Sequence, residues 1–249
     1  MRALVQKLTP SRGIGHSFYW LYNLLLPVIV FGFVYGDLWP FALGIILLSK
    51  WRMLAVRPRF WFVNIRSNAI DIVFGLSMLA FMTQTSNIIF QAGWVVVWAI
   101  WLLLIKPRTD TFWVSAQALL GFIAGMTTLF IEWDNAPLAV LVVVSGLMCY
   151  VAAHHFFSTF DEQYVRLLAL YWAFFGASLT WILGHWLIFY GPIAQPTLLL
   201  SALAVGMGTI YYFDHMDKLS ANVRRQVIFI MIALVLIVLV FSNWGDKIV

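Results

Sequence analysis

A carboxylate stands inside the third hydrophobic segment of the chain, in line with two amides at helical spacing. Asn64, Asn68 and Asp71 fall on one helix face, which Gly75 continues. If the helix starts near Asn64, Asp71 enters the bilayer by about two turns (~10 Å). A charge at that depth is costly unless it is paired or hydrated. We therefore expect Asn64, Asn68 and Asp71 to face the bundle interior and to line a pathway.

The same carboxylate also has a structural interpretation. Arg52 and Arg66 lie close to it in sequence, and either could neutralise Asp71 in an ion pair. The positive N-terminal end of the helix dipole would assist that pairing. A pathway predicts polar side chains that converge at membrane depth, whereas a structural pair predicts local neutralisation without a cavity.

Histidines and carboxylates gather at the predicted cytoplasmic ends of later segments. Both are ligands of divalent metals, so they could form an ionic or metal site. The members are His154, His155, Asp214, His215 and Asp217. Solvation, or pairing with neighbouring lysine and arginine side chains, is the alternative interpretation. The sequence predicts no particular metal or cofactor.

Two further acidic residues near this group have a simpler explanation. Ser158 precedes Asp161, and Thr159 precedes Glu162, at capping-box spacing. In a capping box the two side chains satisfy backbone groups at the start of a helix. We expect them to begin the next helix rather than to bind a ligand.

On the opposite side of the membrane, His185 is the candidate polar residue. It lies about one turn below the predicted outer end of the seventh segment. A histidine there could titrate near neutral pH in an outer vestibule. Packing with a satisfied ring is the alternative.

The composition requires a lipid environment for the elements that carry these residues. Hydrophobic residues make up 63% of the chain and charged residues 10%, and the mean hydropathy is +0.92. The sequence contains no Gly-rich phosphate loop, nucleophile elbow or zinc-protease histidine pair. Cys149 is the one cysteine, which excludes an intrachain disulfide.

Hydropathy predicts an all-α, polytopic bundle that forms one integral membrane domain over residues 1–249. About nine spanning helices are expected, as four hairpins and a C-terminal helix. The predicted spans are 17–36, 38–55, 65–83, 87–105, 111–131, 137–157, 164–190, 195–213 and 223–242.

Two patterns predict how these helices pack. Gly121 and Gly125 form a small-xxx-small pair, which favours close helix contact. Trp94, Trp98 and Trp101 share one face of the fourth span, which is typical of a packed or lipid-facing stripe.

The distribution of positive charge predicts the orientation. With nine spans, fourteen of the 15 Lys and Arg residues fall on one side, and Lys247 alone falls on the other. This asymmetry predicts a multi-pass inner-membrane protein with a cytoplasmic N-terminus and an outer C-terminus. The first segment contains Asn23 and Pro27 and has no small-residue cleavage site, so it is expected to remain as an anchor.

One basic and aromatic loop is expected to lie on anionic lipid headgroups rather than on nucleic acid. Its basic residues are Lys50, Arg52, Arg57, Arg59 and Arg66. The pattern is also compatible with a homo-oligomer or a partner subunit.

Three functions follow from these features. The first is a permease-like or channel-like conduit, or a sensor, for a small solute or ion, with Asn64, Asn68 and Asp71 in its lining. The second is a membrane-embedded enzyme that acts on a lipid or headgroup at the cytoplasmic interface. The third is a non-catalytic scaffold or complex subunit.

Overall fold

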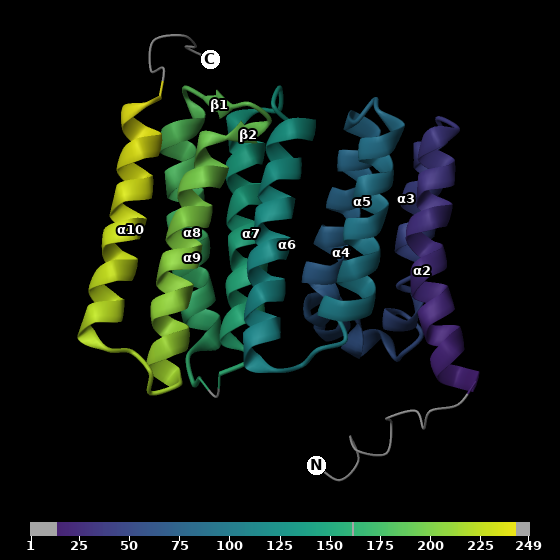
Figure 1. Ribbon diagram of the computed structural model, residues 1–249, viewed down its shortest axis with the longest axis horizontal. Helices are drawn as coiled ribbons and strands as arrows, with labels where there is room; N and C mark the ends of the chain where they lie inside the picture. The colour runs from purple at the N-terminus through teal and green to yellow at the C-terminus, as the bar shows by residue number, and fades with distance from the viewer. Residues whose placement is uncertain (1–13, 161, 243–249) are drawn as a thin grey trace.

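The computed structural model describes the backbone of residues 14–160 and 162–242, and the side chains of residues 20–51, 53–160 and 162–242. Helices dominate this part of the chain and run side by side as a bundle (Figure 1). They are α2 (Ile14–Tyr35), α3 (Trp39–Leu48), α4 (Trp61–Gln84), α5 (Ile88–Ile100), α6 (Thr111–Glu132), α7 (Leu138–Phe157), α8 (Val165–Gly184), α9 (Gln195–His215) and α10 (Ala221–Val240).

Several shorter elements connect or extend these helices. Two 3₁₀ turns, η2 (Trp51–Met53) and η3 (Pro58–Phe60), lie between α3 and α4. A five-residue π-helical turn, η4 (Trp101–Ile105), continues α5. The strands β1 (Phe189–Tyr190) and β2 (Ile193–Ala194) form a small antiparallel hairpin before α9.

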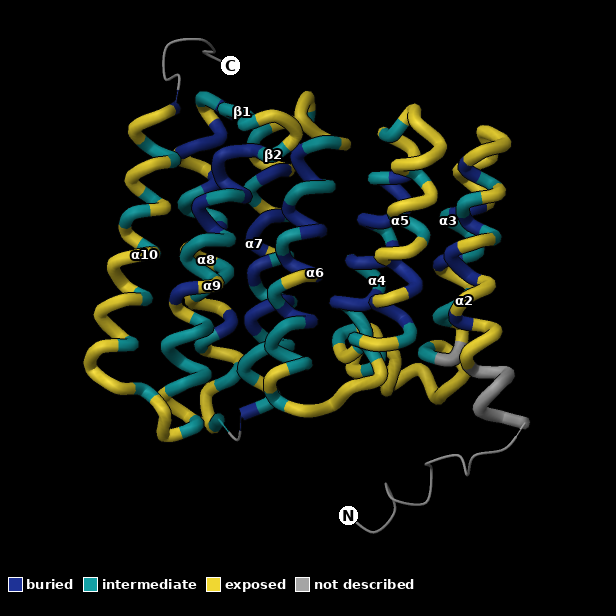
Figure 2. Tube along the Cα trace, viewed as in Figure 1, coloured by how far each residue is buried: buried dark blue, intermediate teal, exposed yellow. Residues whose placement is uncertain are grey.

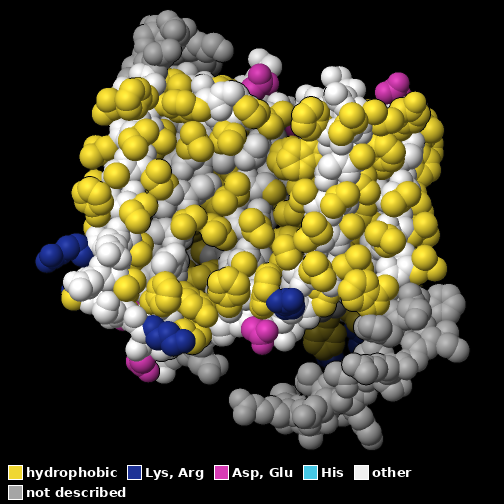
Figure 3. Space-filling model, in the orientation of Figure 1, with side chains coloured by type: hydrophobic (Ala, Val, Ile, Leu, Met, Phe, Trp, Pro, Cys, Tyr) yellow, Lys and Arg dark blue, Asp and Glu magenta, His cyan; other side chains and the backbone are white. Residues whose placement is uncertain are grey.

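Seven helices within the described residues are long and apolar enough to cross a bilayer. They are α4 to α10, where η3 extends α4 and η4 extends α5. The all-α, multi-pass prediction is therefore confirmed. Side chains on the face shown in Figure 3 agree with a lipid environment, because hydrophobic groups cover it and charged groups lie toward its two edges.

Two of the predicted spans end earlier than expected. The segment 38–55 is α-helical only from Trp39 to Leu48, so α3 is about 15 Å long and covers about half of a bilayer core. The hydroxyl of Ser49 bonds the carbonyl of Ile46 at 2.6 Å, and the chain then turns into η2. The segment 164–190 leaves the helix at Gly184, because the residues that follow form the β1–β2 hairpin.

Small residues bring the central helices close together. A Cβ added at Gly121 or at Gly125 would come within 2.6 Å of Ile70 or Val73 on α4, so the predicted glycine pair does mark a close contact. An added Cβ at Gly176 of α8 would come within 2.2 Å of the Cys149 sulfur on α7. These contacts place the buried residues inside the bundle (Figure 2).

Helix α10 lies at the edge of the bundle against α9 and has no buried residue within Ala221–Val240. Its C-terminal end is fixed by polar contacts. The Tyr190 hydroxyl donates to the carbonyl of Val238, and Gln195 Nε2 donates to Ser242 Oγ at 2.6 Å. The β1–β2 hairpin and the start of α9 therefore hold the end of the last helix in place.

Candidate functional site

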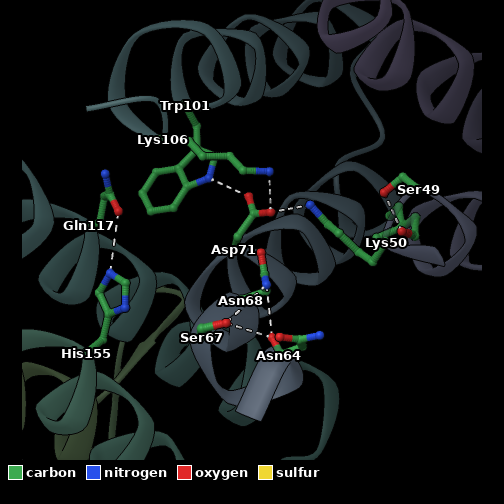
Figure 4. A network of polar contacts seen from close by, with 11 residues as sticks. Ser49, Lys50, Asn64, Ser67, Asn68, Asp71, Trp101, Lys106, Gln117 and His155 are labelled. Carbon is green, nitrogen blue, oxygen red and sulfur yellow. Dashed lines mark hydrogen bonds and ion pairs between the residues drawn. The ribbon is translucent and has the colours of Figure 1, made fainter. Parts of the chain in front are cut away.

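Asp71 is the centre of a buried cluster of polar side chains, with 9% of its surface exposed. Lys50 Nζ and Lys106 Nζ both contact its Oδ2 atom, Lys106 at 2.7 Å. The indole nitrogen of Trp101 donates to the other oxygen, Oδ1, at 3.0 Å. Lys50, Asp71, Trp101 and Lys106 are called the Asp71 cluster below (Figure 4).

The members come from three separate parts of the N-terminal half. Asp71 lies ten residues after the start of α4, about 15 Å along that helix. Lys50 follows the last residue of the short helix α3 by two positions, near the negative end of that helix dipole. Trp101 and Lys106 lie at the beginning and immediately beyond the end of the π-helical turn η4. Each of the two lysines therefore lies just beyond the end of a helical segment, where regular α-helix has already stopped.

An apolar layer adjoins the carboxylate on the side toward the C-terminal end of α4. The ring of Phe74, one turn further along α4, stacks on Trp101 with centroids 3.8 Å apart and planes within 9°. Met78 and Met82 continue this buried face of α4, and Trp98 lies against Gly75. The predicted polar face of α4 therefore ends at Asp71, and the residues beyond it on this face are buried apolar side chains.

Access to the cluster is unequal among its charged members. The exposed fraction is 12% for the Lys50 side chain, 10% for Asp71 and 32% for Lys106. Lys106 is thus the member best placed to exchange with water.

The two predicted amides lie beside this cluster but bond the backbone. Asn68 Nδ2 donates to the carbonyl of Asn64 at 2.9 Å and to Ser67 Oγ at 3.3 Å. Asn64 Nδ2 donates to the carbonyl of Met53 at 3.3 Å, which ties η2 to the first turns of α4. Their part in a pathway stays a prediction, whereas their part in holding the α3–α4 connection is visible.

The prediction that Arg66 pairs with Asp71 was wrong, whereas the prediction of Arg52 stays untested. Arg66 lies with its guanidinium carbon 6.0 Å from the centroid of the Phe62 ring, and the side chain of Arg52 lies outside the described residues. Lys50 and Lys106 pair with Asp71 because the end of α3 and the end of η4 direct these two side chains toward the carboxylate. Lys50, expected among the headgroup-binding residues, is instead buried against Asp71.

The other members of the basic loop remain available to headgroups. Arg57 and Arg59 are exposed, and the Arg59 guanidinium lies 4.6 Å from the centroid of the Phe60 ring. Their contact with anionic lipid stays a prediction.

The second predicted group separates into two pairs. His155 Nε2 lies 3.4 Å from Gln117 Oε1, and Gln117 Nε2 donates to the carbonyls of Ile105 and Arg108 at 2.8 and 3.0 Å. This amide connects α7 to the loop that carries Lys106, as Figure 4 shows for His155 and Gln117.

The other pair joins α9 to the segment before α8. His215 Nε2 lies 3.1 Å from Glu162 Oε1, and the hydroxyl of Tyr211 donates to the same oxygen. Asp217 lies beyond the end of α9 in a left-handed conformation, with φ of 54°, so it does not share a helix face with Asp214. Among the described residues no three His, Cys, Asp or Glu side chains converge, and the expected metal site is not formed by them.

The predicted capping boxes were also wrong. Ser158 and Thr159 bond the carbonyls of His155 and Phe156, at 2.9 and 2.6 Å, so they end α7. Helix α8 begins only at Val165. Asp161 lies outside the described residues, and Glu162 is engaged by α9 as described above.

His185 is exposed at the C-terminal end of α8, and its ring makes its contacts locally. Its Nδ1 atom donates to the carbonyl of Trp181 at 2.7 Å, and its ring meets the edge of the Trp181 ring at 5.4 Å. The packing interpretation of this histidine therefore has geometric support, and a role in an outer vestibule stays a prediction.

Sequence reasoning did not anticipate the cavity in the C-terminal half. It has a volume of about 430 Å³ and is lined by α6, α7, α8 and α9, chiefly by apolar and aromatic side chains. Phe112, Phe156, Trp172, Gly208 and Tyr211 represent the four helices. No residue of the Asp71 cluster lines it, so the described chain contains two distinct candidate sites.

Comparison of the chain with models of protein families, with curated proteins and with solved structures found no match.

Proposed function

We propose that this protein is a permease-class carrier for protons and that the Asp71 cluster is its ion site. One observation carries the proposal: a carboxylate and two amines meet inside the bundle where α3 stops halfway and α5 changes to a π-helical turn. Interrupted helices recur at the ion sites of membrane carriers. Short π-helical segments are frequent at functional sites.

The chemistry of the cluster favours protons over other ions. Its charged members are two amines and one carboxylate, each of which gains or loses a proton. Chains of such groups inside membranes serve as proton relays. Lys106 supplies the contact with water, and Asp71 and Lys50 supply the buried acceptors.

The apolar layer beyond Asp71 corresponds to a state of the carrier that is closed toward the outer side. The stacked rings of Phe74 and Trp101 would have to separate for a proton to leave the cluster outward. Because Trp101 also bonds Asp71, the protonation state of the carboxylate is linked directly to this stack. Access would then alternate as in other carriers.

We further propose that the carrier lies in the inner membrane with nine passes, a cytoplasmic N-terminus and an outer C-terminus. The support is the asymmetry of positive charge, together with the opposite placement of the start of α2 and the end of α10 in the bundle (Figure 1). In this arrangement α3 enters from the outer side and stops halfway, and the chain from Ser49 to Phe60 returns to the cytoplasmic side. Arg57 and Arg59 would contact anionic headgroups there.

A second candidate, the scaffold, has its own observation. Amines of the protein itself pair with the Asp71 carboxylate, and an ion pair formed within the protein can serve structure alone. The two candidates differ in whether charge in the cluster is needed for ion movement.

Proton flux distinguishes the carrier from the scaffold. A neutral-cluster variant, Lys50→Met with Asp71→Asn and Lys106→Met, removes all three charges together, a change that is often neutral or stabilising when the group is replaced as a whole. In liposomes loaded with pyranine, a potassium diffusion potential set by valinomycin should drive proton uptake by the wild type and by a Glu132→Gln control. The neutral-cluster variant should match protein-free vesicles.

Two results contradict the carrier. Equal uptake by the wild type and the neutral-cluster variant would show that the cluster carries no protons. A wild-type rate no higher than that of protein-free vesicles would favour the scaffold.

A further inference from the structure

The cavity between α6, α7, α8 and α9 has the size and lining of a small-molecule site. Its volume of about 430 Å³ lies within the range of pockets that hold compact organic ligands. Phe112 and Trp172 belong to its wall, and Gly208 on α9 leaves room where a side chain would otherwise project. An added Cβ at Gly208 would meet Phe156 only at 3.7 Å, an ordinary contact.

One end of this cavity has a concentration of aromatic rings around Tyr211. The Tyr211 ring lies 5.7 Å from Phe156, 5.0 Å from Phe157 and 5.0 Å from Phe160, measured between centroids. Tyr211 and Phe156 both line the cavity. Ring faces attract cations, and clustered rings are the usual recognition element for organic ammonium groups.

A carboxylate lies next to the Tyr211 end of the cavity. The Tyr211 hydroxyl, on a residue that lines the cavity, donates to Glu162 Oε1, which also receives His215 Nε2. Both contacts use the same oxygen, so Oε2 of Glu162 takes part in neither. Aromatic rings therefore line one end of an apolar cavity, and a carboxylate that is not part of the lining bonds one of them.

We propose that the cavity binds an amphipathic organic cation, with its apolar body among the α6, α7 and α9 side chains and its charge at Tyr211 and Glu162. Charge complementarity favours this class, since acidic Glu162 contacts the hydroxyl of the cavity-lining Tyr211, whose ring also stacks on His215 with centroids 4.1 Å apart. The apolar walls favour a ligand whose body is aromatic or branched rather than a hydrated metal ion. This site shares no residue with the Asp71 cluster, so it does not depend on the carrier proposal.

Radiolabelled tetraphenylphosphonium is a suitable probe, because it is compact, apolar and permanently cationic. In nanodiscs of zwitterionic lipid, the wild type should bind it saturably above protein-free discs. Gly208→Leu fills the cavity and should abolish binding, whereas Gly93→Leu, at a site with no neighbour within 4 Å of an added Cβ, should not. If Gly208→Leu is not monodisperse, Ala116→Leu fills the opposite wall.

The contribution of the Glu162 charge is tested at the Tyr211 end of the cavity. Glu162→Gln should weaken binding about tenfold, the scale expected when one partly exposed opposite charge is removed. Glu132→Gln, at the outer end of α6, should bind as the wild type does. Tetraphenylborate, an anion of the same shape, should compete weakly.

Several results would overturn the proposal. They are absence of saturable binding, equal competition by tetraphenylborate, and unchanged binding by both cavity-filling variants. Recovery of a phospholipid from the wild type but not from Gly208→Leu, without tetraphenylphosphonium binding, would assign the cavity to an acyl chain and would also overturn it.

Discussion

Asp71 pairs with two lysines at once, so the effect of removing it should depend on whether a lysine is removed too. Asp71→Asn leaves the buried Lys50 amine and the partly exposed Lys106 amine without their carboxylate and should destabilise the protein by about 3 kcal/mol. Adding Lys50→Met should recover a large part of that loss, because the most deeply buried cation disappears with the anion. Unfolding of the single and double variants in mixed micelles measures the coupling.

Additive effects of the two substitutions would contradict this prediction. They would mean that Lys50 and Asp71 do not stabilise each other despite their contact. Leu48→Met, on an exposed surface at the end of α3, is a matched control for the change near Lys50.

At the residue scale, the sequence identified the acid but not its partners. Asp71 was predictable because a carboxylate inside a hydrophobic helix is rare. Lys106 was not, since it lies 35 residues away and reaches Asp71 only through the fold. Trp98 and Trp101 are packed, as their spacing indicates, but spacing could not show that the Trp101 nitrogen bonds Asp71.

At the element scale, the contact between α7 and α8 depends on the absence of a side chain at Gly176. Gly176→Ala should destabilise the protein by about 2 kcal/mol, because the new methyl group would overlap the Cys149 sulfur. Adding Cys149→Ala should relieve part of the strain by removing that sulfur. Thermal unfolding of the three variants provides the measurement, with Gly93→Ala as the matched control.

If Gly93→Ala lowered the stability as much as Gly176→Ala, the result would contradict a specific α7–α8 contact. It would instead indicate that glycine is needed for helix geometry in general.

Helix ends were harder to predict than helix existence. Apolar residues continue past Leu48, where α3 ends. A hydropathy window therefore counts the η2 turn as part of the same spanning helix. The helix stops because Ser49 bonds backward and Lys50 turns toward Asp71, and that carboxylate is 21 residues away in sequence. The β1–β2 hairpin likewise depends on contacts with the end of α10.

At the scale of the whole molecule, the charge asymmetry and the fold together predict which loops share a side. In a Cys149→Ala background, Arg57→Cys and Lys218→Cys should be labelled by an impermeant thiol reagent from the cytoplasmic side. Asn135→Cys, in the exposed turn between α6 and α7, should be labelled from the outside. Labelling of all three from one side would contradict the nine-pass topology.

The cavity could not be predicted from the sequence, because it depends on how four helices leave space between them. Tyr211 and Glu162 are 49 residues apart, and the contact that joins them gives no periodic signal. Composition indicated membrane burial for the whole chain but not where the packing would be incomplete.

The central claim, that the cations beside Asp71 carry protons, is tested most directly by replacing and then rebuilding one of them. Lys106→Cys in a Cys149→Ala background leaves Lys50 paired with Asp71 and exposes a thiol at the most accessible position of the cluster. Aminoethyl methanethiosulfonate attaches an ammonium at about the reach of lysine, whereas methyl methanethiosulfonate attaches a neutral group of similar reactivity.

Proton uptake by pyranine-loaded liposomes is the measurement. The carrier account predicts that the Lys106→Cys protein loses uptake, that the aminoethyl disulfide formed by the first reagent restores it and that the methyl disulfide formed by the second does not. Unchanged uptake after the substitution, or equal recovery with both reagents, would contradict the account.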